Sequence, residues 1–269
     1  MNAAERQKPA PGELYLDHIA HFVPDLDAAA KLLESLGFAV TPRSDHRADG
    51  GPAGTSNRCV MLEEGYLEIL APTLDTPNAR RVRALMRRYD GVHLACFGTP
   101  DAAAEQRRLA EHGFAPEPVV SLERTIEDGK LVRFSVVYVP PEKMPEGRIQ
   151  YVQQLTPELL WVDRALKHQN GVVALAAVHV EAPDPVEAAA RWARFSGLLP
   201  LREKDAVRLQ CARGEVLFRK GDTAGISGIT LKCKDPKAFV ARCEKLGLPV
   251  KDYAVRLPPA LGGTWRLAA

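Results

Sequence analysis

The segment VPDLDAAAKLLESLGFAV (residues 23–40) decides the fold, because its pattern recurs three times further along the chain. The other copies are TPDAAAEQRRLAEHGFAP (99–116), APDPVEAAARWARFSGLLP (182–200) and CKDPKAFVARCEKLGLPV (233–250). In each copy an Asp follows or precedes a Pro near the start and a Gly stands near the end. The number of residues from this Asp to this Gly is the same in three copies and one residue longer in the copy at 182–200. A sequence segment that recurs with this spacing identifies an internal structural repeat.

Each copy predicts a strand followed by a helix. The Asp can cap the first amides of the helix, an apolar stripe runs along it, and the Gly can adopt the left-handed conformation that ends it. Short runs rich in β-forming residues come after each helix, for example RCVMLEEGYLEIL (58–70) and VRFSVVYVP (132–140). The repeat is therefore approximately βαβββ.

The repeat predicts an α+β fold class in which four βαβββ modules pair into two domains. The chain has 269 residues, 46% of them hydrophobic, which is enough for two medium domains. We expect an N-terminal domain over residues 14–155 and a C-terminal domain over 171–269. Between them, Thr156 and Pro157 suit a helix start and Asn170-Gly171 suits a stop, which predicts a linker helix over 156–170.

Composition excludes several classes of protein. The net charge is +2 with both signs interspersed, which argues against a nucleic-acid surface. No stretch has the length and apolar character of a membrane span, and the first residues, MNAAERQKPAPGE, lack the apolar core of a signal peptide. The five cysteines form no C-x-x-C pair, so we expect reduced, structural thiols in a cytoplasmic protein that does not associate with membranes.

A histidine recurs in the first strand of the first two modules. HIAHF begins at His18 and HLACF begins at His93, and both have the form His-x-Ala-x-Phe. Alternation along a strand places the His, Ala and Phe of each copy on one face. However, His93 precedes Asp101 by eight residues whereas His18 precedes Asp25 by seven, so a bulge or a one-residue slip stays open.

The last strands of the same two modules also correspond. EGYLEIL places Glu68 where EGRIQYV places Gln150, with Gln153 and Gln154 as rival donors. Two histidines, a glutamate and a glutamine are the ligand content of a mixed nitrogen and oxygen site for a divalent metal. A packing explanation would instead have to bury Glu68, which is costly unless that carboxylate is paired.

The third and fourth modules do not carry this set. Ala177 and Gly228 stand where the first module has His18, and Leu217 and Arg266 stand where it has Glu68. We therefore expect the C-terminal pair to support the first pair, to complete a pocket or to mediate formation of a homodimer.

LDHIAHFVPDLDAAA (16–30), GTSNRCVMLEEGYLEIL (54–70) and the repeat itself resemble the vicinal oxygen chelate superfamily and, within it, the glyoxalase-like proteins. The resemblance covers nearly the whole chain. It implies two vicinal-oxygen-chelate-type domains, with a metal held by the first and last strands of two modules. By position, it implies that a divalent ion, Zn, Ni, Mn or Fe, is held by His18, Glu68, His93 and Gln150.

The stretch DHRADGGPAGTSNR (45–58) is rich in Gly, Asp and Pro and predicts a loop that closes over a ligand. Its polar residues His46, Asn57 and Arg58 are candidates for substrate contact, with ordinary solvated loop chemistry as the alternative.

Three functions follow from these residues and the resemblance. The first is a metal-dependent enzyme of the glyoxalase type, a lyase or isomerase acting on a small oxygen-chelating substrate, in which Glu68 moves a proton. The second is a ferrous extradiol-type dioxygenase using two histidines and one carboxylate, with Gln150 uninvolved. The third is a metal-free module that binds a small molecule. Loss of activity on chelation would favour either enzyme, and oxygen consumption would single out the dioxygenase.

Overall fold

The computed structural model describes residues 2–126 and 129–269, and its elements follow the predicted repeat. The first module comprises β1 (Tyr15–Phe22), α1 (Leu26–Ser35), β2 (Ser44–Ala48), β3 (Gly51–Met61) and β4 (Tyr66–Pro72). The second comprises β5 (Val92–Gly98), α3 (Ala102–Glu111), β6 (Val120–Thr125), β7 (Leu131–Val137) and β8 (Arg148–Gln154). The helix α2 (Pro77–Met86) joins these two modules.

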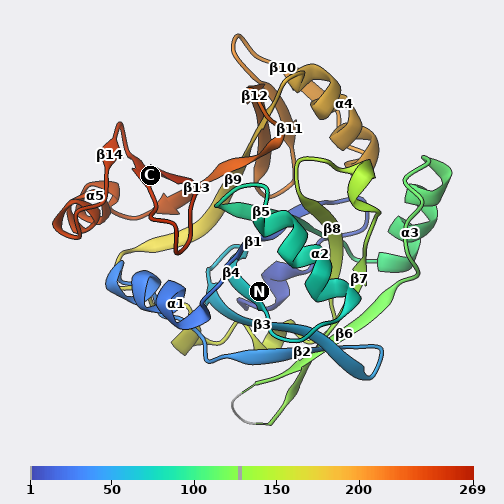
Figure 1. Ribbon diagram of the computed structural model, residues 1–269, viewed down its shortest axis with the longest axis horizontal. Helices are drawn as coiled ribbons and strands as arrows, with labels where there is room; N and C mark the ends of the chain where they lie inside the picture. Colours follow the sequence, from blue (N-terminus) through green and yellow to red (C-terminus); the bar gives the residue numbers. More distant parts are fainter. Residues whose placement is uncertain (1, 127–128) are drawn as a thin grey trace.

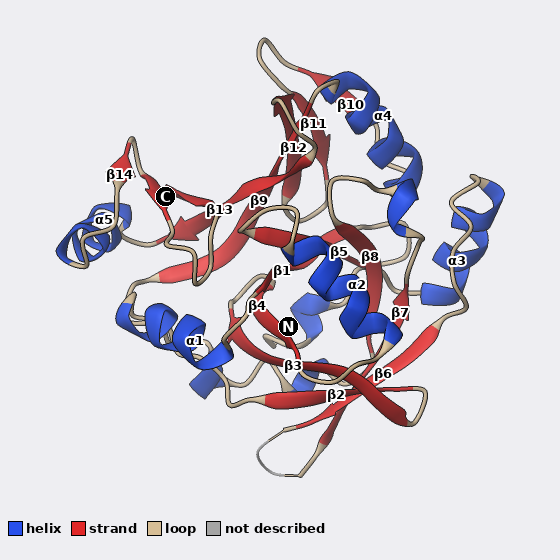
Figure 2. Cartoon of the chain, in the orientation of Figure 1, coloured by secondary structure: helices blue, strands red, loops and turns tan. Residues whose placement is uncertain are grey.

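The C-terminal half repeats the same order with shorter strands. The third module comprises β9 (Val172–Ala182), α4 (Pro185–Ser196), β10 (Pro200–Arg202), β11 (Val207–Gln210) and β12 (Glu215–Lys220). The fourth comprises β13 (Gly225–Cys233), α5 (Pro236–Lys245), β14 (Val250–Lys251), β15 (Ala254–Arg256) and β16 (Thr264–Ala268). The predicted α+β class with four βαβββ modules is therefore confirmed. Figure 2 shows α1, α3, α4 and α5 at the periphery, with the strands between them.

The residues that defined the repeat perform the expected local functions. An Asp side chain accepts hydrogen bonds from the first backbone amides of four helices, namely Asp25, Asp101, Asp184 and Asp235. The Gly after the helix in each repeat has a positive φ of 73° to 88°, which is the left-handed conformation that ends a helix. These caps explain why the Asp-to-Gly spacing is the same in three copies and differs by one residue in the fourth.

The strands of the N-terminal half form a closed ring. Their order is β1-β4-β3-β2-β6-β7-β8-β5, and an antiparallel pairing between β1 and β5 completes the circle. Figure 1 shows these blue and green strands curving around a centre, while the orange and red strands of the C-terminal half extend away from them. Within the described residues, β10 and β14 do not pair with each other, so the C-terminal sheet is open.

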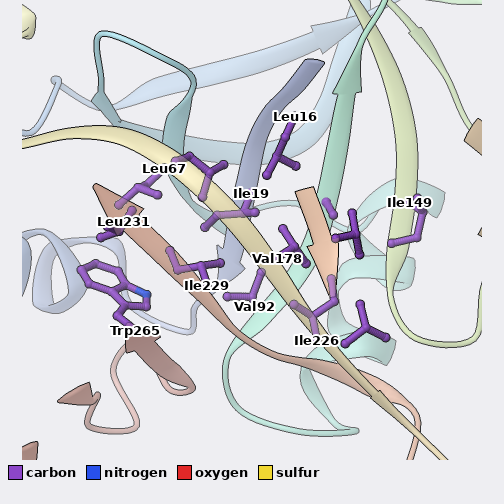
Figure 3. Close-up of a cluster of buried hydrophobic side chains, with 14 of the residues drawn as sticks. Leu16, Ile19, Leu67, Val92, Ile149, Val178, Ile226, Ile229, Leu231 and Trp265 are labelled. Carbon is purple, nitrogen blue, oxygen red and sulfur yellow. The ribbon is translucent and has the colours of Figure 1, made fainter. Parts of the chain in front are cut away.

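A shared apolar core joins the two halves. Side chains of β1, β5, β9 and β13 meet there, among them Ile19, Val92, Val178 and Ile226, as Figure 3 shows. His21 crosses the same junction, because its Nδ1 lies 2.9 Å from the carbonyl oxygen of Leu261 and its Nε2 accepts a hydrogen bond from Trp265. Burial lowers the pKa of His21 to about 4, so this ring is neutral at pH 7 and structural.

The predicted linker helix is wrong. The chain forms two short 3-10 turns, Pro157–Leu159 and Asp163–Ala165, because the residues between them pack inward instead of continuing a helix. Leu160 and Trp161 join the apolar cluster inside the ring, and the Trp161 indole donates a hydrogen bond to the carbonyl of Leu62. These tertiary contacts override the local helical pattern.

The predicted loop over 45–58 is also wrong, because it is a β-hairpin made by β2 and β3. Its turn is Asp49-Gly50, where both residues have positive φ, and the Gly and Pro content came from this turn and the strand after it. All five cysteines are free and buried, in line with structural thiols. Among the described residues, no helix has both the length and the apolar character needed to span a membrane.

Replacing Trp265 with Ala tests the junction between the halves. Trp265 is fully buried and donates to His21, so the variant should lose about 3–5 kcal/mol of unfolding free energy. Leu199→Ala is the control, because Leu199 is 81% exposed and its loss should change stability by less than about 0.5 kcal/mol. Urea denaturation measures both, and equal losses would contradict this account of the junction.

Candidate functional site

A polar cavity lies inside the N-terminal ring. Its polar lining consists of His18, His46, Thr55, Asn57, Tyr66, Glu68, Asn78, Arg124, Tyr138, Arg148 and Gln150. The cavity volume is about 40 Å³, which holds roughly three water molecules. The ring thus brings together His18, Glu68, Gln150, His46 and Asn57 from the residues proposed on sequence grounds. It does not bring His93 or Arg58 to the cavity.

The strand register shows that His93 is not the counterpart of His18. In the antiparallel pair of β1 and β5, His18 faces Cys96 and Ala20 faces Leu94, so Leu94 and Cys96 share the face of His18 and His93 has the opposite face. Leu94 also precedes Asp101 by seven residues, as His18 precedes Asp25, so Leu94 is the counterpart of His18. The parallel pairs agree, because β4 places Glu68 beside Ala20 and β8 places Gln150 beside Cys96. The alignment on the His-x-Ala-x-Phe pattern was therefore one residue out, and a one-residue slip turns a side chain to the opposite face.

His93 has a complete structural environment outside the cavity. Its Nε2 lies 2.7 Å from the carbonyl oxygen of Tyr89, and its Nδ1 accepts a hydrogen bond from the backbone N–H of Phe22 at 3.2 Å. The ring stacks against the rings of Phe22 and Tyr89. Burial also lowers the pKa of His93. The prediction that His93 binds a metal with His18 is therefore wrong, because both ring nitrogens are already bonded to backbone groups.

His18 is held in one orientation by a buried carboxylate. Its Nδ1 lies 2.6 Å from Oδ1 of Asp17, a distance that requires a proton on Nδ1 because a carboxylate only accepts. Gln154 donates to both oxygens of Asp17 at 3.2 Å. The Tyr66 ring stacks on the imidazole at 4.3 Å, and Trp161 packs edge-on against Tyr66. Nε2 of His18 is left as an acceptor in the cavity lining.

Glu68 lies in a second polar group. Asn57 donates to Oε1 of Glu68 at 2.6 Å, and Nε2 of His46 lies 3.8 Å from the same oxygen. Nδ1 of His46 is 3.0 Å from the Thr55 hydroxyl. Burial lowers the pKa of His46 to about 4, although the charge of Glu68 acts in the opposite direction. Arg58 points away from this group and pairs with Asp27 at 2.8 Å.

Two arginines bring positive charge to the cavity. Arg124 is 2% exposed, and its guanidinium donates to the Cys59 sulfur at 3.6 Å. The Arg148 guanidinium lies over the rings of Phe22 and Tyr138, and burial lowers its pKa. Neither guanidinium forms an ion pair with a carboxylate in the described part of the chain. Sequence reasoning missed both, because an arginine in an alternating strand is usually on a solvated face.

The cavity also contains acceptors without donors. Oδ1 of Asn57 and Oε1 of Gln150 are buried and have no hydrogen-bond partner within residues 2–126 and 129–269. An unpaired buried acceptor costs free energy, so these oxygens suit a ligand or water that donates a hydrogen bond. The sequence signals for this pair were the equivalence of Gln150 with Glu68 and the place of Asn57 among the polar residues of the segment 45–58.

The donor set does not fit a divalent metal centre of the expected kind. The position related to His18 is occupied by Leu94, and Glu68 is the one carboxylate among the described lining residues. Its Oε1 already accepts from Asn57, and the two guanidinium groups repel a cation. In the ranges that the structure describes, no group of three or more His, Cys, Asp or Glu is arranged to hold a metal ion.

The fold and the paired modules agree with a comparison of the sequence against protein families. The model of the glyoxalase-like domain matches residues 16–196, which is more than half of the chain. The chain belongs to this glyoxalase-like family of the vicinal oxygen chelate superfamily. The match includes the whole N-terminal ring and the first strand and helix of the C-terminal half.

Solved structures share the fold of this glyoxalase-like protein. A hypothetical protein from Staphylococcus aureus has a TM-score of 0.71 at 14% identity, over 95% of this chain and 100% of that chain. A mutant of 4-hydroxymandelate synthase from Streptomyces coelicolor has a TM-score of 0.55 at 17% identity, over 92% and 78%. The Mn(II)-bound glyoxalase from Novosphingobium aromaticivorans has a TM-score of 0.57 at 8% identity, over 95% and 81%.

Identities this low establish a common fold and leave the function to the site. No curated protein sequence matches the chain. One of the neighbours, the glyoxalase from Novosphingobium aromaticivorans, binds Mn(II), so metal use occurs among proteins of this fold.

The buried imidazole of His46 predicts a loss of stability in acid. Its folded-state pKa of about 4 lies below the ordinary value of 6.5, so the unfolded chain binds more protons as the pH falls between these values. This histidine alone should remove about 2 kcal/mol of unfolding free energy between pH 7 and pH 5. NMR titration of the His46 ring together with urea denaturation at both pH values checks this, and a titration of His46 near 6.5 would contradict it.

Proposed function

We propose that this glyoxalase-like chain binds a small organic anion inside the N-terminal ring and exchanges a proton with it through His18, without a metal ion. The observation that carries the proposal is the excess of positive charge, Arg124 and Arg148 against the single carboxylate of Glu68, in a cavity that also contains an oriented imidazole. The proposed ligand contacts from the sequence, His46 and Asn57, lie in the same lining.

Charge recognition comes from the two arginines. A buried guanidinium without a counter-charge is costly, and a carboxylate or another oxyanion entering the cavity would offset that cost. The free carbonyl oxygens of Asn57 and Gln150 favour a ligand that also carries a hydroxyl or N–H donor. Together these groups define a small anion as the ligand, and a hydrogen-bond donor on that anion would add to its binding.

Proton transfer comes from the pair of Asp17 and His18. A base held by a third group within hydrogen-bond distance is the usual arrangement of an activated acid–base centre. His18 would accept the proton at Nε2, and Asp17 would stabilise the imidazolium that forms. The nearby guanidinium groups would stabilise negative charge that develops on the ligand. Glu68, held by Asn57, is a second carrier for a proton.

The metal-dependent lyase and the ferrous dioxygenase were the expected enzymes, and each needs a metal ion. Leu94 occupies one of the expected ligand positions, and two arginines share the cavity. We therefore propose that the protein acts on its ligand without a metal ion. The ring would have to widen on binding, because the volume of about 40 Å³ admits only roughly three waters.

Isothermal titration with acetate, in buffers of different ionisation enthalpy and with EDTA present, tests the proposal. A bound anion favours the charged imidazole, so we expect proton uptake on binding in the wild type and none in His18→Gln. Arg124→Gln should weaken acetate binding about tenfold or more, because a charge-assisted hydrogen bond contributes about 1.5–3 kcal/mol.

The matched titration uses Mn²⁺ in place of acetate and omits EDTA. We expect no stoichiometric binding that depends on His18. Stoichiometric Mn²⁺ binding that disappears in His18→Gln would contradict the proposal and favour the metal-dependent enzymes. Acetate binding that is unchanged in Arg124→Gln would also contradict the proposal.

A further inference from the structure

A larger pocket adjoins the polar cavity and shares Arg124 with it. The pocket has a volume of about 380 Å³, within the range typical of small-molecule sites. One wall comes from the chain after α1 and the start of β2, and the opposite wall comes from the linker between the two halves. Arg124, at the end of β6, lines both the pocket and the cavity.

We call this the tail pocket, and its walls are mostly apolar. Its lining consists of Ala39, Val40, Thr41, Pro42, Ser44, Arg124, Ile126, Leu159, Leu160, Val162, Arg164 and Ala165, with Arg164 on the exposed side. Val40, Ile126, Leu159 and Val162 contribute hydrocarbon surface. The hydroxyl groups in the lining are already used, because Thr41 accepts from the backbone N–H of Cys59 and Ser44 donates to the carbonyl of Thr125. The pocket therefore offers an apolar ligand group a largely apolar surface beside the buried guanidinium of Arg124.

Arg124 has no negative partner within the chain as described. Its hydrogen-bond acceptor is the Cys59 sulfur at 3.6 Å, and burial raises the pKa of that thiol to about 12. The thiol is therefore neutral at pH 7 and does not balance the guanidinium. Since the guanidinium presents several N–H donors in one plane, it can still bind a carboxylate through two parallel hydrogen bonds.

We infer that the tail pocket binds the apolar end of a monocarboxylate whose carboxylate group pairs with Arg124. The ligand class is thus an organic acid with a short aliphatic or aromatic tail. The inference rests on the proposed function for the anion at Arg124, and it adds where the remainder of the ligand lies. It also gives the linker a role, because Leu159, Val162 and Ala165 form one wall of the pocket.

Calorimetric titration with hexanoate, acetate and 1-hexanol tests the inference in the full-length protein. Hexanoate has four more methylene groups than acetate, and each buried methylene contributes about 0.8 kcal/mol, so it should bind at least tenfold more tightly. It should also bind at least tenfold more tightly than 1-hexanol, and Arg124→Gln should abolish this second preference.

Ala165→Phe fills part of the pocket lining. We expect it to remove the preference for hexanoate over acetate, and Val162→Phe should do the same from a neighbouring position. Ala103→Phe is the matched control, because Ala103 is exposed on α3 and far from the lining of the pocket. Urea denaturation of each variant distinguishes a filled pocket from a failure to fold.

Each outcome decides between the two proposals. Hexanoate binding that is no tighter than acetate binding, or that is unchanged in both phenylalanine variants, overturns the tail pocket even if acetate binds as proposed. Equal binding of hexanoate and 1-hexanol overturns the pairing with Arg124. A hexanoate preference lost in Ala165→Phe, but without proton uptake through His18, supports the tail pocket and contradicts the proposed function.

Discussion

The antiparallel pairing of β1 with β5 is the constraint on which the rest of the structure depends. It closes the N-terminal ring and fixes which residues of both strands face the cavity. Because side chains alternate along a strand, the same register that turns His18 inward turns Leu94 inward and His93 outward. The chemistry of the site therefore follows from a single register rather than from the number of histidines in the sequence.

Charge is the second determinant of the site. Two guanidinium groups without ion-pair partners in the described residues share a small cavity with Glu68, which Asn57 already engages. Such an arrangement is unfavourable in the free protein and becomes favourable when an anion enters. Asp17 adds a different function, because it accepts the hydrogen bond from Nδ1 of His18 and leaves Nε2, in the cavity lining, able to accept a proton.

The sequence predicted the fold well because each module carries its own Asp cap and Gly stop, which are local signals. It predicted His18, Glu68 and Gln150 on the inner face, but it placed His93 there by matching residue types instead of counting from Asp101. The linker prediction failed because tertiary packing decided its conformation, whereas the hairpin of β2 and β3 was missed because its Asp49-Gly50 turn was interpreted as part of a loop. The entry of Arg124 into the cavity depends on which strands become neighbours, which no local pattern contains. Asp17 directly precedes His18 in the chain, so its support of that imidazole was missed although both residues lie in the quoted segment.

A crystal structure of the protein grown with both acetate and Mn²⁺ tests the central claim most directly. The account predicts density for acetate against Arg124 or Arg148, with no anomalous manganese peak between His18, Glu68 and Gln150. A manganese peak bonded to these three side chains, with no anion at either arginine, would contradict it and identify the ring as a metal centre.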